Sequence, residues 1–355
     1  MAAIHKRQLR RNEIGRILIR ATNWIGDAVM TLPAVEAVKE NFPCSDITIL
    51  AKPWVAPIYE GLPAVSRVMT YEKRGGIVGS THGVLKSCGM IRCARFDVAI
   101  LFQNAFEAAL IAFLGGVPIR VGYKTDGRGL LLTHGVLPRS AQKSQHQVEY
   151  YLDLLRYMGW TAKSSDPLIR VPEAAYSGMC RLMVEKGIQG DAFLMGLAPG
   201  AAYGKSKRWP ARRFAEVGDK AAKEWGARIV IFGSEGEKEI CDEVVRSMEG
   251  APLNLCGKTS LSEAIALINQ CKMFLSNDSG LMHVAAALNV PTLAVFGSTD
   301  PMATGPRGLK SGIVRNSVEC APCLKPECDM DYKCLLGVTS EQVWEEMGRL
   351  WKRIQ

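Results

Sequence analysis

Residues 273–296 read MFLSNDSGLMHVAAALNVPTLAVF, and this stretch decides the fold class. It begins with an apolar run at 273–276 and ends with another at 292–296, both typical of buried strands. Between them, a helix is expected from Gly280, and the small residues at 285–287 allow it to pack closely on a sheet. A strand, a helix and a second strand in this order predict a parallel βαβ unit.

The same alternation continues along the whole chain. Strands are predicted at 16–21, 46–51, 96–102, 120–123, 193–198, 227–232 and 253–255, and helices at 27–41, 105–114, 147–158, 212–225, 238–248 and from 261. Two such series indicate an α/β protein built from two Rossmann-like domains that face each other across a ligand cleft. A linker is predicted at 164–175, so we place the domains at 1–168 and 169–355. The final helix is expected to pack back on the first domain.

Composition restricts the partners of this chain. It has 355 residues, of which 48% are hydrophobic and 22% charged, and a formal net charge of +9. This positive charge favours anionic partners, such as phosphates, nucleic acid or an acidic membrane surface. There is no secretory signal and no apolar run of the roughly 20 residues that span a bilayer, so we expect a cytoplasmic protein with reduced cysteines.

The loop after the first predicted strand reads TNWIGD (22–27) and includes Asn23, Trp24 and Asp27. It lacks the G-x-G-x-x-G pattern of dinucleotide-binding proteins, which counts against an NAD-dependent oxidoreductase. Asp27 has two interpretations. It could cap the helix that begins here, or it could act as a general base that takes a proton from a hydroxyl nucleophile.

The loop at 199–210 reads PGAAYGKSKRWP and also follows a predicted strand. It combines Gly200 with Lys207 and Arg208 ahead of a helix, which is how many proteins hold phosphate. The spacing does not match a Walker A loop. The alternative is a solvated basic turn.

A third loop, within SNDSGLMHVAAA (276–287), places Asp278, Ser279 and Gly280 at the start of a helix. Backbone N–H groups and the helix dipole at such a position suit a pyrophosphate. His283 follows in the first turns, where it could donate to a ribose or phosphate oxygen or could simply be a packed helix residue.

Four cysteines lie close together near the end of the chain: Cys320, Cys323, Cys328 and Cys334. Four thiols at short spacing in a cytosolic protein predict a tetrahedral structural Zn²⁺ site, remote from the chemistry. The alternative is a reduced loop without metal.

Four stretches together resemble glycosyltransferase family 9, the ADP-heptose:lipopolysaccharide heptosyltransferases, over nearly the whole chain. They are TNWIGDAVMTLPA (22–34), PGAAYGKSKRWP (199–210), RIVIFGS (228–234) and NDSGLMHVAAALNVPTLAVFGSTDP (277–301). Within the family, the first of these, residues 103–123 and the cysteine cluster most resemble heptosyltransferase II. The resemblance implies a GT-B fold and inverting transfer of heptose from ADP-heptose to a heptose of the lipopolysaccharide inner core, with no catalytic metal or other cofactor.

The resemblance also implies roles for individual residues. Asp27 matches the family's base, and Lys207 matches the lysine that contacts the donor phosphate, with Arg208 and Gly200 beside it. The donor-binding turn is matched by Asp278, Ser279, Gly280 and His283, and Glu237 falls where related enzymes contact the donor. The family often has threonines just before its donor lysine, whereas this chain has Ala201, Ala202 and Tyr203.

The implied acceptor is a phosphorylated lipid in the inner leaflet of the cytoplasmic membrane, so peripheral membrane association is expected. Candidate acceptor contacts are Asn23, Trp24, Arg120, Lys124 and Arg128, followed by Lys73 and Arg74. Two other interpretations stay open: a family member of heptosyltransferase I or III type with another acceptor, and a basic nucleic-acid-binding protein. The basic residues are spread rather than striped and carry no usual recognition motif, so nucleic acid is not the expected partner.

Overall fold

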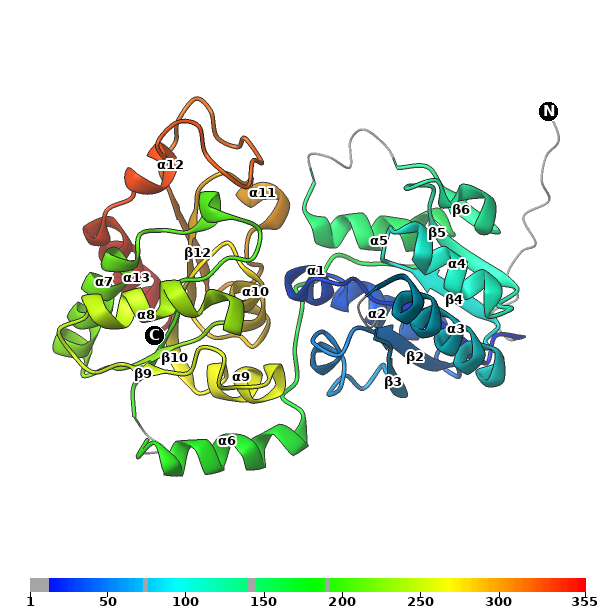
Figure 1. The fold of residues 1–355 in the computed structure, drawn as a ribbon, viewed down its shortest axis with the longest axis horizontal. Coiled ribbons are helices and arrows are strands. Elements are labelled where there is room, and N and C mark those ends of the chain that lie inside the picture. Colours follow the sequence, from blue (N-terminus) through cyan, green and yellow to red (C-terminus); the bar gives the residue numbers. More distant parts are fainter. Residues whose placement is uncertain (1–12, 73–75, 139–144, 189–191) are drawn as a thin grey trace. The chain divides into compact units, whose positions relative to one another are not determined.

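The computed structural model describes residues 13–72, 76–138, 145–188 and 192–355, with the backbone alone at 76–82. The chain divides into two compact units, residues 1–165 and 166–355. The predicted boundary after residue 168 lies just beyond this division. In each unit, helices pack around one sheet (Figure 1). No helix in the described part of the chain is long and apolar enough to span a membrane.

The sheet of the first unit has six parallel strands in the order β3-β2-β1-β4-β5-β6. The strands are β1 (Arg16–Arg20), β2 (Asp46–Ala51), β3 (Arg67–Thr70), β4 (Val98–Leu101), β5 (Ile119–Tyr123) and β6 (His134–Val136). In the central strand, Ile17 pairs with Ile47 on one side and with Val98 on the other. These residues are fully buried, as expected of a parallel sheet that is covered on both faces.

Among the described residues of this unit, the sheet is surrounded by the α-helices α1 (Ile25–Met30), α2 (Leu32–Asn41), α3 (Gly76–Ala94), α4 (Phe106–Leu114) and α5 (Gln147–Tyr157). The single helix predicted at 27–41 is therefore wrong, because the chain forms two helices that meet at Thr31. Pro33 explains the break: proline lacks the N–H that a continuous helix needs, but it is tolerated in the first turn of a new helix.

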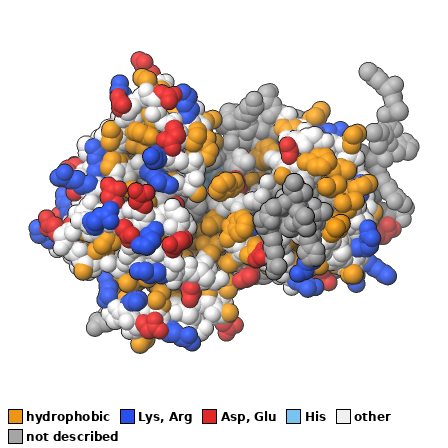
Figure 2. All heavy atoms as spheres, viewed as in Figure 1, with side chains coloured by type: hydrophobic (Ala, Val, Ile, Leu, Met, Phe, Trp, Pro, Cys, Tyr) orange, Lys and Arg blue, Asp and Glu red, His pale blue; other side chains and the backbone are white. Residues whose placement is uncertain are grey.

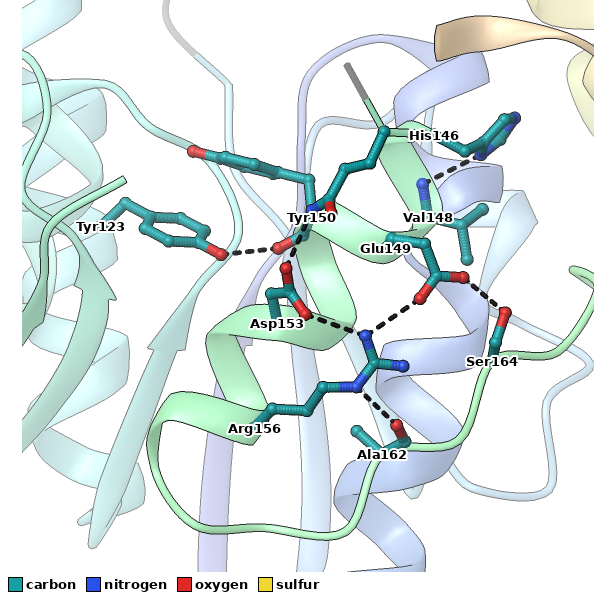
Figure 3. A network of polar contacts seen from close by, with 10 residues as sticks. Tyr123, His146, Val148, Glu149, Tyr150, Asp153, Arg156, Ala162 and Ser164 are labelled. Carbon is teal, nitrogen blue, oxygen red and sulfur yellow. Dashed lines mark hydrogen bonds and ion pairs between the residues drawn. The ribbon is translucent and has the colours of Figure 1, made fainter. Parts of the chain in front are cut away.

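Helix α5 ties the end of the first unit to its sheet (Figure 3). The Tyr123 hydroxyl, at the end of β5, donates to the carbonyl of Tyr150 at 2.7 Å. Arg156 forms ion pairs with Glu149 at 3.0 Å and Asp153 at 2.8 Å, and its Nε donates to the carbonyl of Ala162 at 2.8 Å. This network fixes the chain directly before the division between the units.

The second unit repeats the architecture with six parallel strands in the order β12-β11-β10-β7-β8-β9. The strands are β7 (Leu194–Ala198), β8 (Arg228–Ile231), β9 (Leu253–Asn254), β10 (Cys271–Asn277), β11 (Thr292–Phe296) and β12 (Ser311–Arg315). The βαβ unit predicted at 273–296 is thus confirmed as β10, a helix and β11. Together with the first sheet, this confirms the predicted α/β fold.

The helices of the second unit are α6 (Glu173–Glu185), α7 (Ala211–Trp225), α8 (Lys238–Ser247), α9 (Leu261–Ile268), α10 (Gly280–Ala287), α11 (Pro301–Thr304), α12 (Lys333–Leu336) and α13 (Ser340–Ile354). Because α6 begins at Glu173, the last residues of the predicted linker are helical. The final helix, α13, packs on α7, β11 and β12 of its own unit, where Val343, Met347 and Leu350 are buried. Its packing on the first domain stays a prediction.

We predict that Gly196→Ala lowers the free energy of unfolding by about 1–3 kcal/mol, the usual cost of overpacking a core. Gly196 lies in β7, where a Cβ atom would come within 2.4 Å of the Phe274 ring. The control is Gly348→Ala in α13, where a Cβ meets nothing within 4 Å and should stabilise the helix by about 0.5–1 kcal/mol. Thermal and urea unfolding, followed by circular dichroism, gives the free energy of unfolding of both variants. Equal changes in the two variants would contradict the close packing of Gly196 against Phe274.

Candidate active site

In each sheet, the order of the strands reverses beside the first strand of the unit. From β1 the chain proceeds outward to β2 and β3, and β4 then lies on the other side of β1. From β7 it proceeds to β8 and β9, and β10 lies on the other side of β7. The loops that leave two such neighbouring strands diverge at their carboxyl ends, which is where open α/β sheets bind ligands. The predicted site residues Asp27, Lys207 and Asp278 lie in or directly after these loops.

Lys207 and Asp278 meet at the carboxyl edge of the second sheet. The Lys207 ammonium lies 2.5 Å from Asp278 Oδ2, and the two side chains are only 14% and 5% exposed. The Thr299 hydroxyl donates to the same carboxylate oxygen at 2.6 Å. These residues come from the loops after β7, β10 and β11. An ammonium has three donors, so Lys207 can bind Asp278 and still donate to a phosphate oxygen.

An aromatic ring also contacts Lys207. Its ammonium lies 5.1 Å from the centre of the Tyr203 ring, within the range of a cation–π interaction. The Tyr203 hydroxyl in turn donates to the carbonyl of Leu324 at 2.5 Å. Tyr203 lies in the stretch where the family often has threonines. In this chain, the tyrosine ring contacts the lysine instead. Sequence reasoning did not identify this role.

The buried amide of Asn277 fixes both ends of the 199–210 loop. Its Oδ1 accepts from the backbone N–H of Trp209 at 3.0 Å, and its Nδ2 donates to the carbonyl of Pro199 at 2.7 Å. The Arg208 guanidinium donates to the carbonyl of Ala201 in the same loop, at 3.2 and 3.3 Å. These bonds hold the loop in one shape before any ligand arrives.

Glu237 and Gly200, both predicted donor residues, lie against each other. A Cβ atom on Gly200 would be 2.2 Å from Glu237 Oε1, so a larger residue here would displace the Glu237 side chain. The other carboxylate oxygen of Glu237 accepts from the backbone N–H and the hydroxyl of Ser234, at 2.8 and 2.7 Å. Glu237 therefore forms a capping box with Ser234 at the start of the 3₁₀ turn Glu235–Glu237. Its carboxylate also lies against Gly200 in the 199–210 loop.

The turn after β10 places its residues as predicted, at the start of α10. Ser279 is the residue before the helix, which begins at Gly280, and its hydroxyl lies 3.0 Å from that of Ser276. His283 lies in the first turn of the helix but is only 6% exposed. The backbone N–H groups of this turn are therefore better placed for a phosphate than the imidazole.

The cysteine segment is not remote from the other predicted site residues, and that expectation was wrong. The carbonyl of Pro326 accepts from the backbone N–H of Ser206 at 3.1 Å, and the N–H of Leu324 donates to the carbonyl of Ser298 at 2.8 Å. With the bond from Tyr203 to Leu324, residues 324–326 fasten the 199–210 loop to the turn after β11. The chain after β12 folds back over the edge of the sheet, which spacing in the sequence could not indicate.

The four thiols of this segment have different surroundings. Cys320 is exposed, whereas Cys334 is buried in the core, where burial raises the pKa of its thiol. Cys328 Sγ accepts from the backbone N–H groups of Met330 and Tyr332, both at 3.3 Å. Among residues that the structure describes, no three His, Cys, Asp or Glu side chains are arranged to hold a metal ion. The zinc site stays a prediction.

Asp27 lies in the first turn of α1, directly after β1. The N-cap residue of this helix is Trp24, whose side chain forms no capping hydrogen bond, and Asp27 lies within the first turn. Burial raises the pKa of Tyr59 and Tyr151, and the nearby Asp27 carboxylate adds to both increases. The half-buried carboxylate is therefore close to two buried phenols at the edge where a ligand is expected.

Three of the predicted acceptor contacts lie at this edge. Trp24 is 62% exposed at the start of α1. Asn23 accepts from Arg20 at 2.9 Å through its side chain, and its carbonyl accepts from Trp54 Nε1 at 3.0 Å. Lys124, which follows β5 directly, is also exposed at this edge.

The structure argues against an acceptor role for Arg120 and Arg128. Arg128 is fully buried and donates to the carbonyl of Tyr123 and the side chain of Asn104, both at 2.9 Å. It holds its own loop, and burial lowers its pKa to about 10. Arg120 lies near the amino end of β5, at the opposite edge of the sheet from Asp27. Lys73 and Arg74 fall outside the described residues.

Sequence reasoning missed a cationic cluster at the carboxyl ends of β1, β2 and β3. Arg20 ends β1, and its guanidinium lies 4.7 Å from the centre of the buried Tyr71 ring. Lys52 follows β2, and its ammonium lies 3.9 Å from the same ring. The Tyr71 hydroxyl lies 3.5 Å from a Glu107 carboxylate oxygen. Because β3 was not predicted, nothing indicated that Tyr71 follows a strand.

Comparisons with known proteins agree with this geometry. The model of glycosyltransferase family 9 (heptosyltransferase) matches residues 85–333. Lipopolysaccharide heptosyltransferase 2 of Escherichia coli is 30% identical over 94% of this chain and 98% of its own length. The Salmonella typhimurium protein of the same name is 31% identical, with the same coverage of both chains.

A solved structure of E. coli ADP-heptose lps heptosyltransferase II matches 96% of this chain and 99% of its own, with a TM-score of 0.81 and 27% identity. The family match covers well over half of the chain, so neither a nucleic-acid-binding protein nor an NAD-dependent oxidoreductase describes it. The chain is a glycosyltransferase and belongs to glycosyltransferase family 9.

Proposed function

We propose that this enzyme transfers L-glycero-D-manno-heptose from ADP-heptose to a heptose of the lipopolysaccharide inner core, with inversion at the anomeric carbon. The observation that carries the proposal is the Lys207–Asp278 pair, set in the loops after β7 and β10. Relatives named heptosyltransferase 2 cover nearly the whole chain, which supports a heptose acceptor over the acceptors of heptosyltransferase I or III.

Transfer requires the bond between the anomeric carbon and the diphosphate to break, so negative charge grows on the departing ADP. Lys207 and the backbone N–H groups at Ser279 and Gly280 would stabilise that charge, because they are already oriented before the reaction begins. Glu237 and Arg208 would act through the shape of the 199–210 loop. No catalytic metal is needed for this role.

Asp27 would take the proton from the acceptor hydroxyl as that hydroxyl attacks the anomeric carbon. It is half-buried at the carboxyl edge of the first sheet, beside the exposed Trp24. Arg20 and Lys52 at the same edge are only 2% and 7% exposed, so they would hold this edge in shape, as Arg128 holds its own loop, rather than bind the acceptor themselves. The acceptor is a lipid, so the enzyme would work in the cytoplasm at the inner face of the cytoplasmic membrane.

We expect Asp27→Ala to lower kcat by at least about 100-fold, the low end for loss of a general base, with ADP affinity and the melting temperature nearly unchanged. The control is Asp46→Ala, which removes a carboxylate at the amino end of β2, on the opposite edge of the same sheet. Transfer kinetics, ADP titration and thermal melting are the measurements. Near-normal turnover of the Asp27 variant would exclude this residue as the base.

Lys207→Ala should raise the KM for the donor more than tenfold, since a hydrogen bond to a charged group contributes about 1.5–3 kcal/mol. Lys205→Ala, an exposed lysine in the same loop, changes the net charge equally and should have little effect. Tyr203→Leu should weaken donor binding more than Tyr203→Phe, which keeps the ring beside Lys207. The prediction fails if the Lys205 and Lys207 variants have the same donor KM at several salt concentrations.

For the cysteine segment, we expect elemental analysis of protein purified without a metal-binding tag to find about one zinc per chain, because four thiolates make one closed site. Cys320→Ser and Cys323→Ser should lose the metal, and the exposed Cys44→Ser should retain it. A chelator should lower the melting temperature of the second unit. Substoichiometric metal in the unmodified protein would refute the site and leave the transferase proposal standing.

A further inference from the structure

Helix α4 has the reverse of the usual distribution of apolar side chains. Its sequence is FEAALIAFL, with Glu107 as its single charged residue. The buried side is formed mainly by alanines: Ala108, Ala109 and Ala112, with Ile111. The largest side chains face solvent, with Phe106 44% and Phe113 47% exposed. A helix that only had to cover a sheet would bury its phenylalanines and expose polar residues.

The exposed residues form one continuous apolar face. Phe106, Leu110, Phe113 and Leu114 are spaced at i, i+4, i+7 and i+8, and the first, third and fourth are exposed. The 3₁₀ turn Arg128–Leu131 packs beside α4 and adds Leu130, which is 99% exposed. We call these five residues the α4 face. Figure 2 shows apolar side chains gathered where Figure 1 places α4.

Cations lie directly against the α4 face. The Arg120 guanidinium lies 5.2 Å from the centre of the Phe113 ring, and Arg92 donates to the carbonyl of Leu114 at 2.7 Å. Lys86 on the adjacent α3 and Arg95, directly after that helix, are exposed as well. The acids nearby are the half-buried Glu107, which lies near the Tyr71 hydroxyl, and Asp126, which accepts from the backbone N–H of Phe106 at 2.6 Å.

We propose that the α4 face docks on the surface of an anionic lipid bilayer, with its aromatic and aliphatic side chains among the acyl chains and Arg92 and Arg120 at the phosphate groups. An apolar helix face bordered by arginines is the pattern of helices that lie in the plane of a membrane interface. The overall charge of +9 adds attraction to anionic lipid. The inference rests on the proposed function, since it names the surface by which the enzyme reaches a lipid acceptor.

The position of α4 fits that task. Phe106 begins the helix just after β4, at the carboxyl edge of the sheet that also carries Asp27. A helix that lies flat on the bilayer would bring this edge of the first unit to the membrane surface. An apolar partner protein would not need the arginines at the border of the face, which is why lipid is the occupant that the charges favour.

The test is co-sedimentation of the full chain with vesicles of phosphatidylcholine and phosphatidylglycerol in a 7:3 ratio, against vesicles of phosphatidylcholine alone. Phe113→Ser/Leu114→Ser should lower binding to the anionic vesicles at least about tenfold, because several buried CH₂ groups are lost. Val184→Ser/Leu309→Ser, which removes two exposed apolar side chains from the second unit, should bind as the unmodified chain does. Arg92→Gln should weaken binding to anionic vesicles more than to neutral ones.

Melting curves must show that each variant is folded, and transfer to a soluble truncated acceptor without vesicles should be unchanged in all of them. If the unmodified chain transfers no heptose, the proposed function is contradicted. Vesicle binding can still be measured in that case, so the docking proposal is tested separately. The docking proposal is overturned if the unmodified chain does not bind anionic vesicles, or if the Phe113/Leu114 variant binds them normally. It is also overturned if analytical ultracentrifugation shows that the unmodified chain is a dimer and the Phe113/Leu114 variant a monomer. The α4 face would then be a contact between two copies of the chain.

Discussion

The ion pair between Lys207 and Asp278 is the interaction on which the proposed donor site of this enzyme depends. Both groups are largely buried, so removing either partner would leave an uncompensated charge in a poorly solvated place. The pair joins the loops after β7 and β10, the two strands between which the chain order of the second sheet reverses. The ammonium that we propose contacts the diphosphate is thus held at the carboxyl edge of the sheet, close to the start of α10, where backbone N–H groups could also bind phosphate.

Three further contacts keep this lysine in position, and each comes from a different part of the second unit. Asn277 bonds to both ends of the 199–210 loop, and Glu237 fills the space above Gly200. The segment at 324–326 holds Tyr203 and Ser206 from the other side. A site arranged in this way needs little reorganisation when charge develops on the leaving group, which is the main source of electrostatic catalysis. The cysteine segment is therefore connected to the proposed chemistry through the backbone.

The sequence was sufficient to predict the parallel sheets, because their buried strands are continuous apolar runs bounded by loops. It was also sufficient to predict that Lys207 and Asp278 each lie in or after a loop that follows a strand, but not that these two strands, β7 and β10, pair with each other. It did not predict β3 or β12, which are edge strands with half-exposed residues, or α6, which buries few side chains. The role of Tyr203 could not be predicted, because it depends on a hydrogen bond to Leu324, which is distant in the sequence. The burial of Arg128 could not be predicted either, because it depends on how its loop packs against Tyr123 and Asn104.

The central proposal, which family membership and geometry support, is that this enzyme moves heptose from ADP-heptose onto a heptose. The most direct test is to incubate the purified chain with ADP-heptose and truncated inner-core acceptors that carry no heptose, a terminal heptose, or a completed heptose pair, and to identify the products by mass spectrometry. We expect one heptose to be added to the acceptor that ends in a single heptose, with release of ADP. Transfer only to the acceptor that lacks heptose, or no transfer from ADP-heptose to any of them, would contradict it.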